Sequence, residues 1–421
     1  MAFCSNATIF ATTWRAVRLV AAGRLTVMVL LLTWCLGSNQ VFGDDSIDAP
    51  STHRVVVFTG SGPENPFWNL FIDFMRQAAN DLQIEVDVVF ADGNRNRMES
   101  QVRRTCESAN KPDAIVVQSF KRNGANILAV ADRHNMPVFL VNSGLTDDEQ
   151  QKVGEPRAIL KSWIGEMLPD DFRAGQLLAD TLIDEARKDS SRIAPDGRVH
   201  VIGLNGVVSH NASIQRLAGL RDAIARRSDE AALDQVVAAD WDLELARKRC
   251  RVLQRRYPDA AVIWTASDHM ATGAIEAMRD LERIPGRDVV IGGVDATPQA
   301  IKLIQEGTLA ASVGGHFMEG GWVAVLLHDF FRGVDPSQLP KHYASPMILV
   351  TRDNIDTFLS QLNRTAWERT DFRQFSRVHD PEMSSYRFDP RVLSNAIEST
   401  EPPTTRSSDL DAIKKDAGQR E

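Results

Sequence analysis

Short apolar segments alternate with amphipathic segments from residue 53 to about residue 360. The first is Arg54-Val55-Val56-Val57-Phe58, a β-branched run ended by Thr59-Gly60-Ser61-Gly62-Pro63, which predicts a strand and then a loop. From Phe67 to Leu82 apolar residues recur at helical spacing. The same alternation predicts strands at 84–90, 114–117, 138–141, 159–164, 199–203, 234–238, 261–265 and 288–293, and helices at 97–109, 125–134, 171–187, 212–227, 242–256, 269–282 and 297–306.

Continuous apolar strands separated by amphipathic helices are typical of parallel sheets that helices cover on both faces. A polar, acidic loop at 145–157 interrupts the alternation, which then restarts. We therefore predict an α/β fold with two doubly wound parallel-sheet lobes. Ligands of such sheets bind beyond the carboxyl ends of the strands, so the residues that directly follow each strand are the candidates for a site.

The loops after these strands share a polar and aromatic character. Amides and carboxylates can bridge hydroxyl groups, and aromatic faces can cover the apolar side of a small ligand. Any single Asp or Asn at a strand–helix junction is better explained as a helix N-cap, and Phe67 alone as a core residue. The shared character of eight loops at the same sheet edges favours a site for a polyhydroxylated molecule. The residues concerned include Asn65, Phe67, Trp68, Asn142, Asp171, Arg216, Trp241, Asp268 and Asp295.

The two ends of the chain differ from the alternating part. Arg15, Arg18 and Arg24 precede or flank an apolar run at 25–34, and small or tolerated residues stand before Gly43. This order predicts a signal peptide at 1–43, cleaved near Gly43, and thus an exported protein. A retained membrane anchor is the alternative, but the run is shorter than the ~20 apolar residues that span a bilayer. Residues 379–421 are poor in apolar side chains and predict a flexible tail.

Composition and charge exclude several classes of protein. The 421 residues are 43% hydrophobic and 25% charged, which is ordinary for a globular chain of two or three compact units. A formal net charge of −8 argues against nucleic acid as a partner. The cysteines of the mature part, Cys106 and Cys250, fall on separate predicted helices without metal-ligand spacing, so we expect free thiols unless the fold brings them together. No catalytic triad, phosphate-binding glycine loop or zinc-binding histidine spacing is present, which predicts a protein that is not an enzyme and holds no metal or cofactor.

Four ordered segments carry a resemblance to a known family. They are Gly62–Trp68, Asp171–Ala179, Thr265–Ala274, and Gly292–Pro298 followed by Ile304–Val313. Together they resemble the periplasmic sugar-binding proteins of the ribose/galactose-binding type over about residues 54–360. The resemblance implies two lobes joined by a three-strand hinge, with crossovers near 143–164, 314–316 and 344–348. The first lobe would then be 53–160 plus 316–345, and the second 161–315 plus 346–378.

The resemblance also implies roles for individual residues. Asn65, Phe67, Trp68 and Asn142 would contact the ligand from the first lobe, and Asp171, Arg216, Asp268 and Asp295 from the second, with Trp241 bordering the cleft. The chain departs from the family pattern at three places: Ser267 replaces an amide, Ile214 replaces an arginine, and Gly315-His316 stands where sugar binders often carry Gln. A standard ribose or galactose site is therefore not assumed.

Two functions are compatible with this resemblance. The first is a monomeric periplasmic solute-binding protein that presents a small sugar-like ligand to an ABC importer. The second is a sensory receptor that signals ligand occupancy to a membrane histidine kinase or cyclase, as autoinducer-binding receptors of the same fold do. A repressor with this fold would need an N-terminal helix-turn-helix, whereas this chain begins with a predicted signal.

Overall fold

The computed structural model of the chain describes residues 52–362 and 364–388. All of them belong to one compact unit that begins at Pro50. The predicted signal peptide, 1–43, and residues 389–421 of the predicted tail lie outside the described residues. No helix of the described part is long and apolar enough to cross a bilayer.

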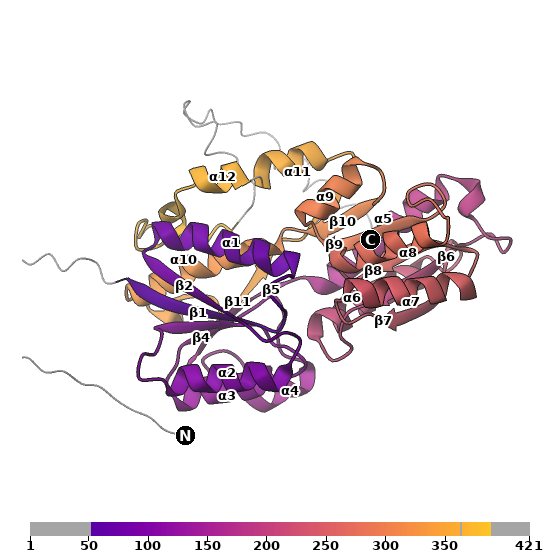
Figure 1. Cartoon of the computed structure of the whole chain (residues 1–421). Coiled ribbons are helices and arrows are strands. Elements are labelled where there is room, and N and C mark those ends of the chain that lie inside the picture. The colour runs from indigo at the N-terminus through magenta and orange to yellow at the C-terminus, as the bar shows by residue number, and fades with distance from the viewer. Residues whose placement is uncertain (1–51, 363, 389–421) are drawn as a thin grey trace, which may run out of the picture. The chain divides into compact units, whose positions relative to one another are not determined.

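Two six-stranded sheets organise this unit, each with helices on both faces (Figure 1). The first sheet has the order β11-β5-β4-β3-β1-β2 with every neighbouring pair parallel, and the second has the order β12-β10-β9-β8-β6-β7 with only β12 antiparallel. The predicted fold of two doubly wound lobes is confirmed. The strands are β1 (His53–Thr59), β2 (Ile84–Phe90), β3 (Ala114–Val117), β4 (Val138–Val141), β5 (Trp163–Pro169), β6 (Val199–Asn205), β7 (Ala231–Ala238), β8 (Ala260–Thr265), β9 (Val290–Asp295), β10 (Ala311–Gly314), β11 (His342–Ser345) and β12 (Ile348–Thr351).

The helices connect these strands and supply most of the core. The helices are α1 (Pro66–Asp81), α2 (Arg95–Glu107), α3 (Gly124–Arg133), α4 (Asp147–Val153), α5 (Asp171–Arg187), α6 (Asn211–Arg226), α7 (Leu243–Arg256), α8 (Asp268–Asp280), α9 (Pro298–Gln305), α10 (Glu319–Phe331), α11 (Ile355–Leu362) and α12 (Arg364–Arg369). The central strands, such as β3, β8 and β9, are buried along their whole length, as expected for parallel strands covered on both faces. Cys106 and Cys250 are buried on α2 and α7 and are free, as predicted.

The first crossover lies later in the chain than the predicted range 143–164. Strand β5 pairs with β4, so the first lobe extends to Pro169 rather than ending at residue 160. The acidic segment predicted to be a loop forms α4 instead, because Thr146 and Glu149 make a capping box. Glu149 also accepts a hydrogen bond from Ala125 N at 3.1 Å, which ties α4 to the start of α3. The other two crossings lie after β10, which ends at Gly314, and between β11 and β12.

The C-terminal segment divides between the two lobes. Strand β12 pairs with β10 of the second sheet. The segment from α12 onward packs on the first lobe instead: the Trp367 and Phe372 rings contact Phe74 of α1. The tail predicted to be flexible from 379 is packed in its described part, since Phe388 stacks on Trp322 of α10. The polar composition of this segment predicted that the entropy lost on ordering it would keep it flexible. Packing of a few aromatic side chains offsets that loss in the described part.

Candidate functional site

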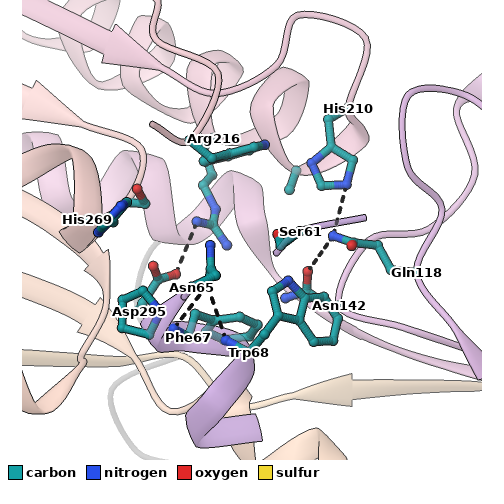
Figure 2. A pocket seen from close by; sticks show the side chains of 14 residues that line it. Ser61, Asn65, Phe67, Trp68, Gln118, Asn142, His210, Arg216, His269 and Asp295 are labelled. Carbon is teal, nitrogen blue, oxygen red and sulfur yellow. Dashed lines mark hydrogen bonds and ion pairs between the residues drawn. The ribbon is translucent and has the colours of Figure 1, made fainter. Parts of the chain in front are cut away.

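A cavity of about 50 Å³ lies where the carboxyl ends of strands from both sheets meet (Figure 2). This volume is room for a few water molecules. It is well below the ~300 Å³ or more that a ligand pocket usually offers, so a larger ligand requires the two walls to move apart. The lining residues are Ser61, Asn65, Pro66, Phe67, Trp68, Gln118, Asn142, His210, Ala212, Arg216, Trp241, Ser267, His269 and Asp295.

The N-terminus of α1 forms one side of the first-lobe wall. Asn65 caps this helix: its Oδ1 accepts hydrogen bonds from Phe67 N at 3.1 Å and Trp68 N at 3.2 Å. Its Nδ2 takes no part in the cap, and Figure 2 shows it pointing away from the helix toward the cavity. The cap therefore uses only Oδ1 of this side chain and leaves Nδ2 directed at the cavity.

Two aromatic side chains on the first turn of α1 face the same cavity. Phe67 and Trp68 are only 6% and 2% exposed and pack edge to face. Phe67 also stacks on the His316 imidazole, with ring centroids 4.6 Å apart. Their rings give the first-lobe wall an apolar surface of the kind that covers the C–H face of a sugar ring.

The rest of the first-lobe wall consists of side-chain amides that are linked by hydrogen bonds. Gly60 N donates to Gln118 Oε1 at 3.0 Å, and Gln118 Nε2 donates to Asn142 Oδ1 at 3.3 Å. Asn142 N donates in turn to the buried carboxylate of Glu319 at 2.7 Å. These bonds fix the orientation of both amides before any ligand arrives. Gln118 was not among the predicted site residues, although it directly follows β3.

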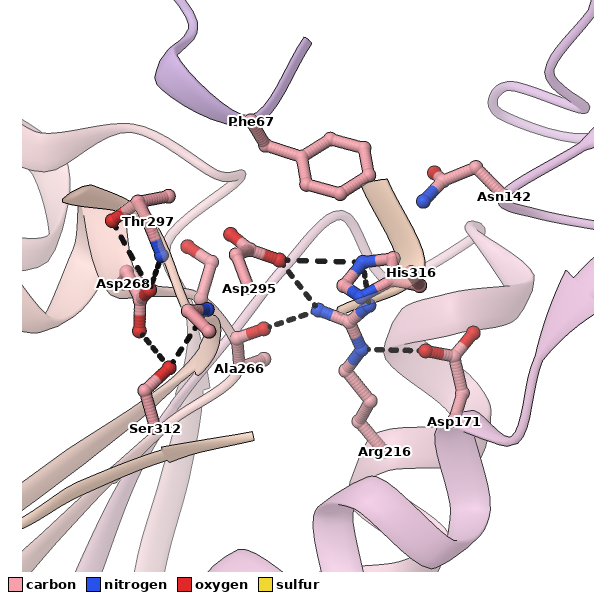
Figure 3. A network of polar contacts seen from close by, with 12 residues as sticks. Phe67, Asn142, Asp171, Arg216, Ala266, Asp268, Asp295, Thr297, Ser312 and His316 are labelled. Atoms are coloured by element: carbon pink, nitrogen blue, oxygen red, sulfur yellow. Dashed lines mark hydrogen bonds and ion pairs between the residues drawn. The ribbon is translucent and has the colours of Figure 1, made fainter. Parts of the chain in front are cut away.

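Arg216 is the centre of the second-lobe wall (Figure 3). It is only 3% exposed, and its Nε donates to Asp171 Oδ1 at 2.7 Å. One of its terminal nitrogens donates to Ala266 O at 2.7 Å and lies 3.6 Å from Asp295 Oδ1. The Arg216 guanidinium also lies over the Trp241 ring, 5.7 Å from its centroid. Four elements of the second lobe are thus tied to one cation.

Burial dominates the electrostatics of this cluster. It raises the pKa of Asp295 well above the ordinary value, an effect that Arg216 opposes and that Asp268 and Asp171 reinforce. Burial likewise raises the pKa of Asp171, against the attraction of Arg216. Burial, and then Arg216, hold the pKa of His316 well below the ordinary value. The single cation of this wall is therefore already matched by carboxyl groups, and the imidazole beside it is neutral.

Two predicted ligand contacts lie behind the cavity rather than on its surface. Asp171 does not line the cavity and holds Arg216 from behind. Asp268 accepts hydrogen bonds from Thr297 N at 2.8 Å and from Ser312 Oγ at 2.6 Å, and burial raises its pKa to about 7. Its side chain thus joins the loops after β8 and β9 to β10. The strand-end position was predicted correctly, but the direction of the side chain depends on neighbouring loops that the sequence does not show.

Several residues at this edge have left-handed backbone conformations. Asn142, Trp241 and Asp295 have φ values of 62°, 65° and 127°. Ala296 follows Asp295 with a φ of 52°. Such conformations are uncommon for residues other than glycine and concentrate at functional sites, where the surrounding structure holds them. Backbone strain therefore marks the same strand ends that the polar side chains mark.

The structure brings seven of the predicted residues to the cavity: Asn65, Phe67, Trp68, Asn142, Arg216, Trp241 and Asp295. Sequence reasoning missed Ser61, Gln118, His210, Ala212 and His269 as lining residues, and treated Ser267 only as a departure from the family pattern. Ser61 and Gln118 follow strands closely and could have been found on that basis. The imidazole of His210 lies in a loop whose path only the fold determines.

The comparisons with known proteins agree with this architecture. A family model described as a periplasmic binding protein domain matches residues 56–329. The chain belongs to this family, and the resemblance to its sugar-binding members is confirmed.

Individual relatives are similar at low identity. The chain is 25% identical to the ribose import binding protein of Escherichia coli (strain K12), over 45% of this chain and 54% of that protein. The match therefore spans about half the length of that relative. The ribose import binding protein of Bacillus subtilis (strain 168) is 22% identical over 69% of this chain and 85% of its own length. A crystal structure of a periplasmic sugar-binding protein from Pseudomonas fluorescens is similar with a TM-score of 0.71 and 29% identity, over 81% of this chain and 99% of that one.

Proposed function

We propose that this chain is an exported solute-binding protein that captures a small, neutral, polyhydroxylated ligand between its two lobes and presents it to an ABC importer. The observation that carries the proposal is the composition of the cavity at the strand ends. One wall offers amides and aromatic rings, and the other offers one arginine surrounded by carboxyl groups. Hydroxyl groups both donate and accept, so they can bridge such walls, while ring C–H groups lie on the aromatic faces.

The same geometry disfavours an anionic ligand. Arg216 already bonds Asp171 and Ala266 O and lies beside Asp295. Among the lining residues it is the one arginine, and none is a lysine. A carboxylate or phosphate would have to displace Asp171 or Asp295, and truncating or unpairing a buried ion pair costs about 3–5 kcal/mol. A neutral sugar can instead donate to the carboxyl groups and accept from the arginine.

The relatives support this assignment. Those named above are ribose import binding proteins and a periplasmic sugar-binding protein. By this proposal the mature chain works in the periplasm as a monomer, with an ABC permease as its membrane partner and without catalytic residues or a cofactor.

The alternative is a sensory receptor read by a membrane histidine kinase or cyclase. The C-terminal segment favours this alternative. Helix α12 and residues 372–388 pack on the first lobe outside the two sheets and give it an additional surface that a membrane partner could contact. A pull-down of detergent-solubilised membrane partners by the closed chain separates the two: a permease supports import, and a kinase or cyclase supports sensing.

A thermal-shift screen of residues 44–421 tests the proposed ligand class. The panel contains pentoses, hexoses, polyols, inositols and furanone signals, with the corresponding sugar acids as charged controls. A ligand at a hundred times its dissociation constant adds about 2.7 kcal/mol to the free energy of unfolding, which shifts Tm by several degrees. A clear shift with a neutral member supports the proposal. No change in Tm with any neutral compound, or a change with sugar acids alone, contradicts it.

A further inference from the structure

The two lobes contact each other directly at one edge of the cavity. Gln118, which follows β3 of the first lobe, lies with its Nε2 3.3 Å from Nε2 of His210, which precedes α6 of the second lobe (Figure 2). The Phe120 ring meets the same imidazole edge to face, with centroids 5.8 Å apart. Next to His210, Asn211 Nδ2 donates to Leu145 O at 3.1 Å. His210 is thus the second-lobe residue around which this contact is built.

The hydrogen bonds of Gln118 determine where the proton of His210 sits. Gln118 Oε1 accepts from Gly60 N, so the amide nitrogen is the atom that faces His210. An amide N–H donates, and therefore Nε2 of His210 has to accept. The imidazole proton then resides on Nδ1, which is buried and makes no hydrogen bond of normal geometry, although the Ser119 backbone is close enough to act on the pKa of this imidazole. The contact forms only with a neutral imidazole.

The groups around His210 also oppose a positive charge on it. It is 3% exposed, and the Phe120 and Trp241 rings pack against it from the two lobes. The charged groups that act on it are Arg216 on α6 and Lys121 in the loop after β3, both cations. Burial, followed by Arg216 and with a smaller part from Lys121, lowers its pKa to about 3 although the Ser119 backbone opposes the shift.

We propose that His210 is a positioning residue for closure of the cleft: its neutral imidazole joins the lobes through Gln118, and protonation separates them. Closing then transfers the proton of an exposed imidazolium to solvent, and acidification opens the cleft. For the ligand this means weaker capture at acidic pH, a consequence that rests on the proposed function.

The direction and size of the effect follow from linkage. In the open form His210 faces water and has the ordinary pKa of about 6.5. Because His210 has a lower pKa in the closed form, its neutral state favours closure above pH 6.5. This contribution to closure is lost as the pH falls below 6.5. The closed-to-open ratio therefore falls about tenfold per pH unit, and at pH 5 it is about thirtyfold below its value at neutral pH.

Other buried groups near the hinge also titrate. The pKa values of His316 and His269 are lowered by burial, as for His210, whereas those of Asp295 and Glu319 are raised. The contribution of His210 is therefore measured as a difference between the natural chain and a variant that lacks only this imidazole.

The test uses residues 44–421 without ligand, which excludes Cys4 and Cys35. Spin labels are placed at R103C on α2 and K248C on α7, which are exposed in the first and second lobes, while Cys106 and Cys250 are buried and stay unlabelled. Nuclear magnetic resonance gives the pKa of His210, and pulsed electron resonance gives the interlobe distance at pH values above and below it. We expect a pKa below 5 and a longer distance once His210 is protonated. A pKa of 6 or more, or a distance that stays constant while His210 titrates, overturns the proposal.

Three variants identify the imidazole as the cause. In His210→Gln an amide oxygen can still accept from Gln118 but cannot titrate, so the distance should stay short at both pH values. Gln118→Glu places a carboxylate against His210, which should raise its pKa above 6.5 and make closure stronger at pH 5. His134→Gln, at the end of α3 outside the cleft, should behave as the natural chain does.

Two outcomes contradict the proposal. One is an interlobe distance that lengthens equally in His210→Gln and in the natural chain, and the other is acid opening that persists in Gln118→Glu. Because no ligand is used, failure of the sugar screen leaves this result unaffected.

Discussion

The two walls of the cleft are built differently. The first-lobe wall contains a serine, three amides and two aromatic rings and carries no formal charge, whereas the second-lobe wall contains Arg216, Asp295 and two histidines. Each wall is held mainly by bonds within its own lobe: Asn65 by the α1 cap and Gln118 by Gly60, and Arg216 by Asp171 and Ala266. Preorganised walls lose little side-chain entropy when a ligand binds.

The difference indicates a division of roles. For the proposed ligand, we expect the charged wall to provide strong, directional hydrogen bonds and so to determine the orientation of the ligand. The uncharged wall provides amides and ring faces that complete the site when the lobes close. Substitutions in the charged wall should therefore weaken ligand binding more than substitutions in the uncharged wall do.

The largest effect is expected for Arg216→Met. This change leaves Asp171, Asp295 and Ala266 O buried without their cation, and breaking a buried ion pair costs about 3–5 kcal/mol of stability. Ligand binding should be lost as well. Urea denaturation measures the stability, and Arg226→Met on the exposed side of the same helix is the matched control, expected to cost far less because solvent screens its ion pairs. Equal costs for the two variants would show that the Arg216 cluster is not a structural centre.

Asp295→Asn should reduce binding while leaving the fold intact. Asp295 lines the cavity, and a hydrogen bond to a charged group contributes about 1.5–3 kcal/mol, so the Kd should rise at least tenfold. The asparagine also tolerates the left-handed backbone at this position. Asp240→Asn, which changes an exposed aspartate with a φ of 53° at the same sheet edge, serves as the control. Calorimetric titration compares the two, and an unchanged Kd in Asp295→Asn would remove this residue from the site.

A smaller effect is expected on the uncharged wall. Phe67→Leu keeps an apolar side chain but loses the flat ring that stacks on His316 and faces the cavity. Aromatic contacts contribute about 0.5–1.5 kcal/mol beyond their buried area, so the Kd should rise by about threefold to tenfold. Phe330→Leu on α10, which does not line the cavity, should leave the Kd unchanged. A loss as large as that in Asp295→Asn would contradict the division between the walls.

The smallest effect concerns pH rather than affinity. Burial raises the pKa of Glu319, whose carboxylate accepts from Asn142 N and Ser345 Oγ. Because the folded pKa of this acid is raised, its stabilising contribution is complete below the ordinary glutamate pKa and is lost as pH rises. Glu319→Gln should therefore become more stable relative to the natural chain as pH rises from 5 to 8. Thermal unfolding across that range measures the trend, and parallel curves for the two proteins would refute it.

The sequence predicted the parts of this account that depend on local pattern. Alternation predicted both sheets, and the strand-end rule placed Asn65, Asn142 and Asp295 at the cavity. It could not separate Asp295, which faces the cavity, from Asp268, whose carboxylate turns to Thr297 and Ser312.

Other misses have the same physical origin. The acidic segment around α4 was predicted to be a loop because its stability comes from a capping box and from Glu149 bonding the preceding helix, α3. His210 gave no signal because its importance depends on Gln118, a residue of the other lobe that is 92 positions away. Contacts between distant segments determine these features, and a single sequence does not record them.

The most direct test of the central claim is a calorimetric titration of the chain at pH 7.5 with a neutral sugar and with its sugar acid. Galactose and galacturonic acid form one such pair, and any neutral sugar that shifts Tm in the screen can replace galactose together with its acid. The neutral sugar should bind at least tenfold more tightly, because the carboxylate of the acid meets a cleft whose one arginine is already paired with Asp171. Tighter binding of the acid, or equal binding of the two, would contradict the account.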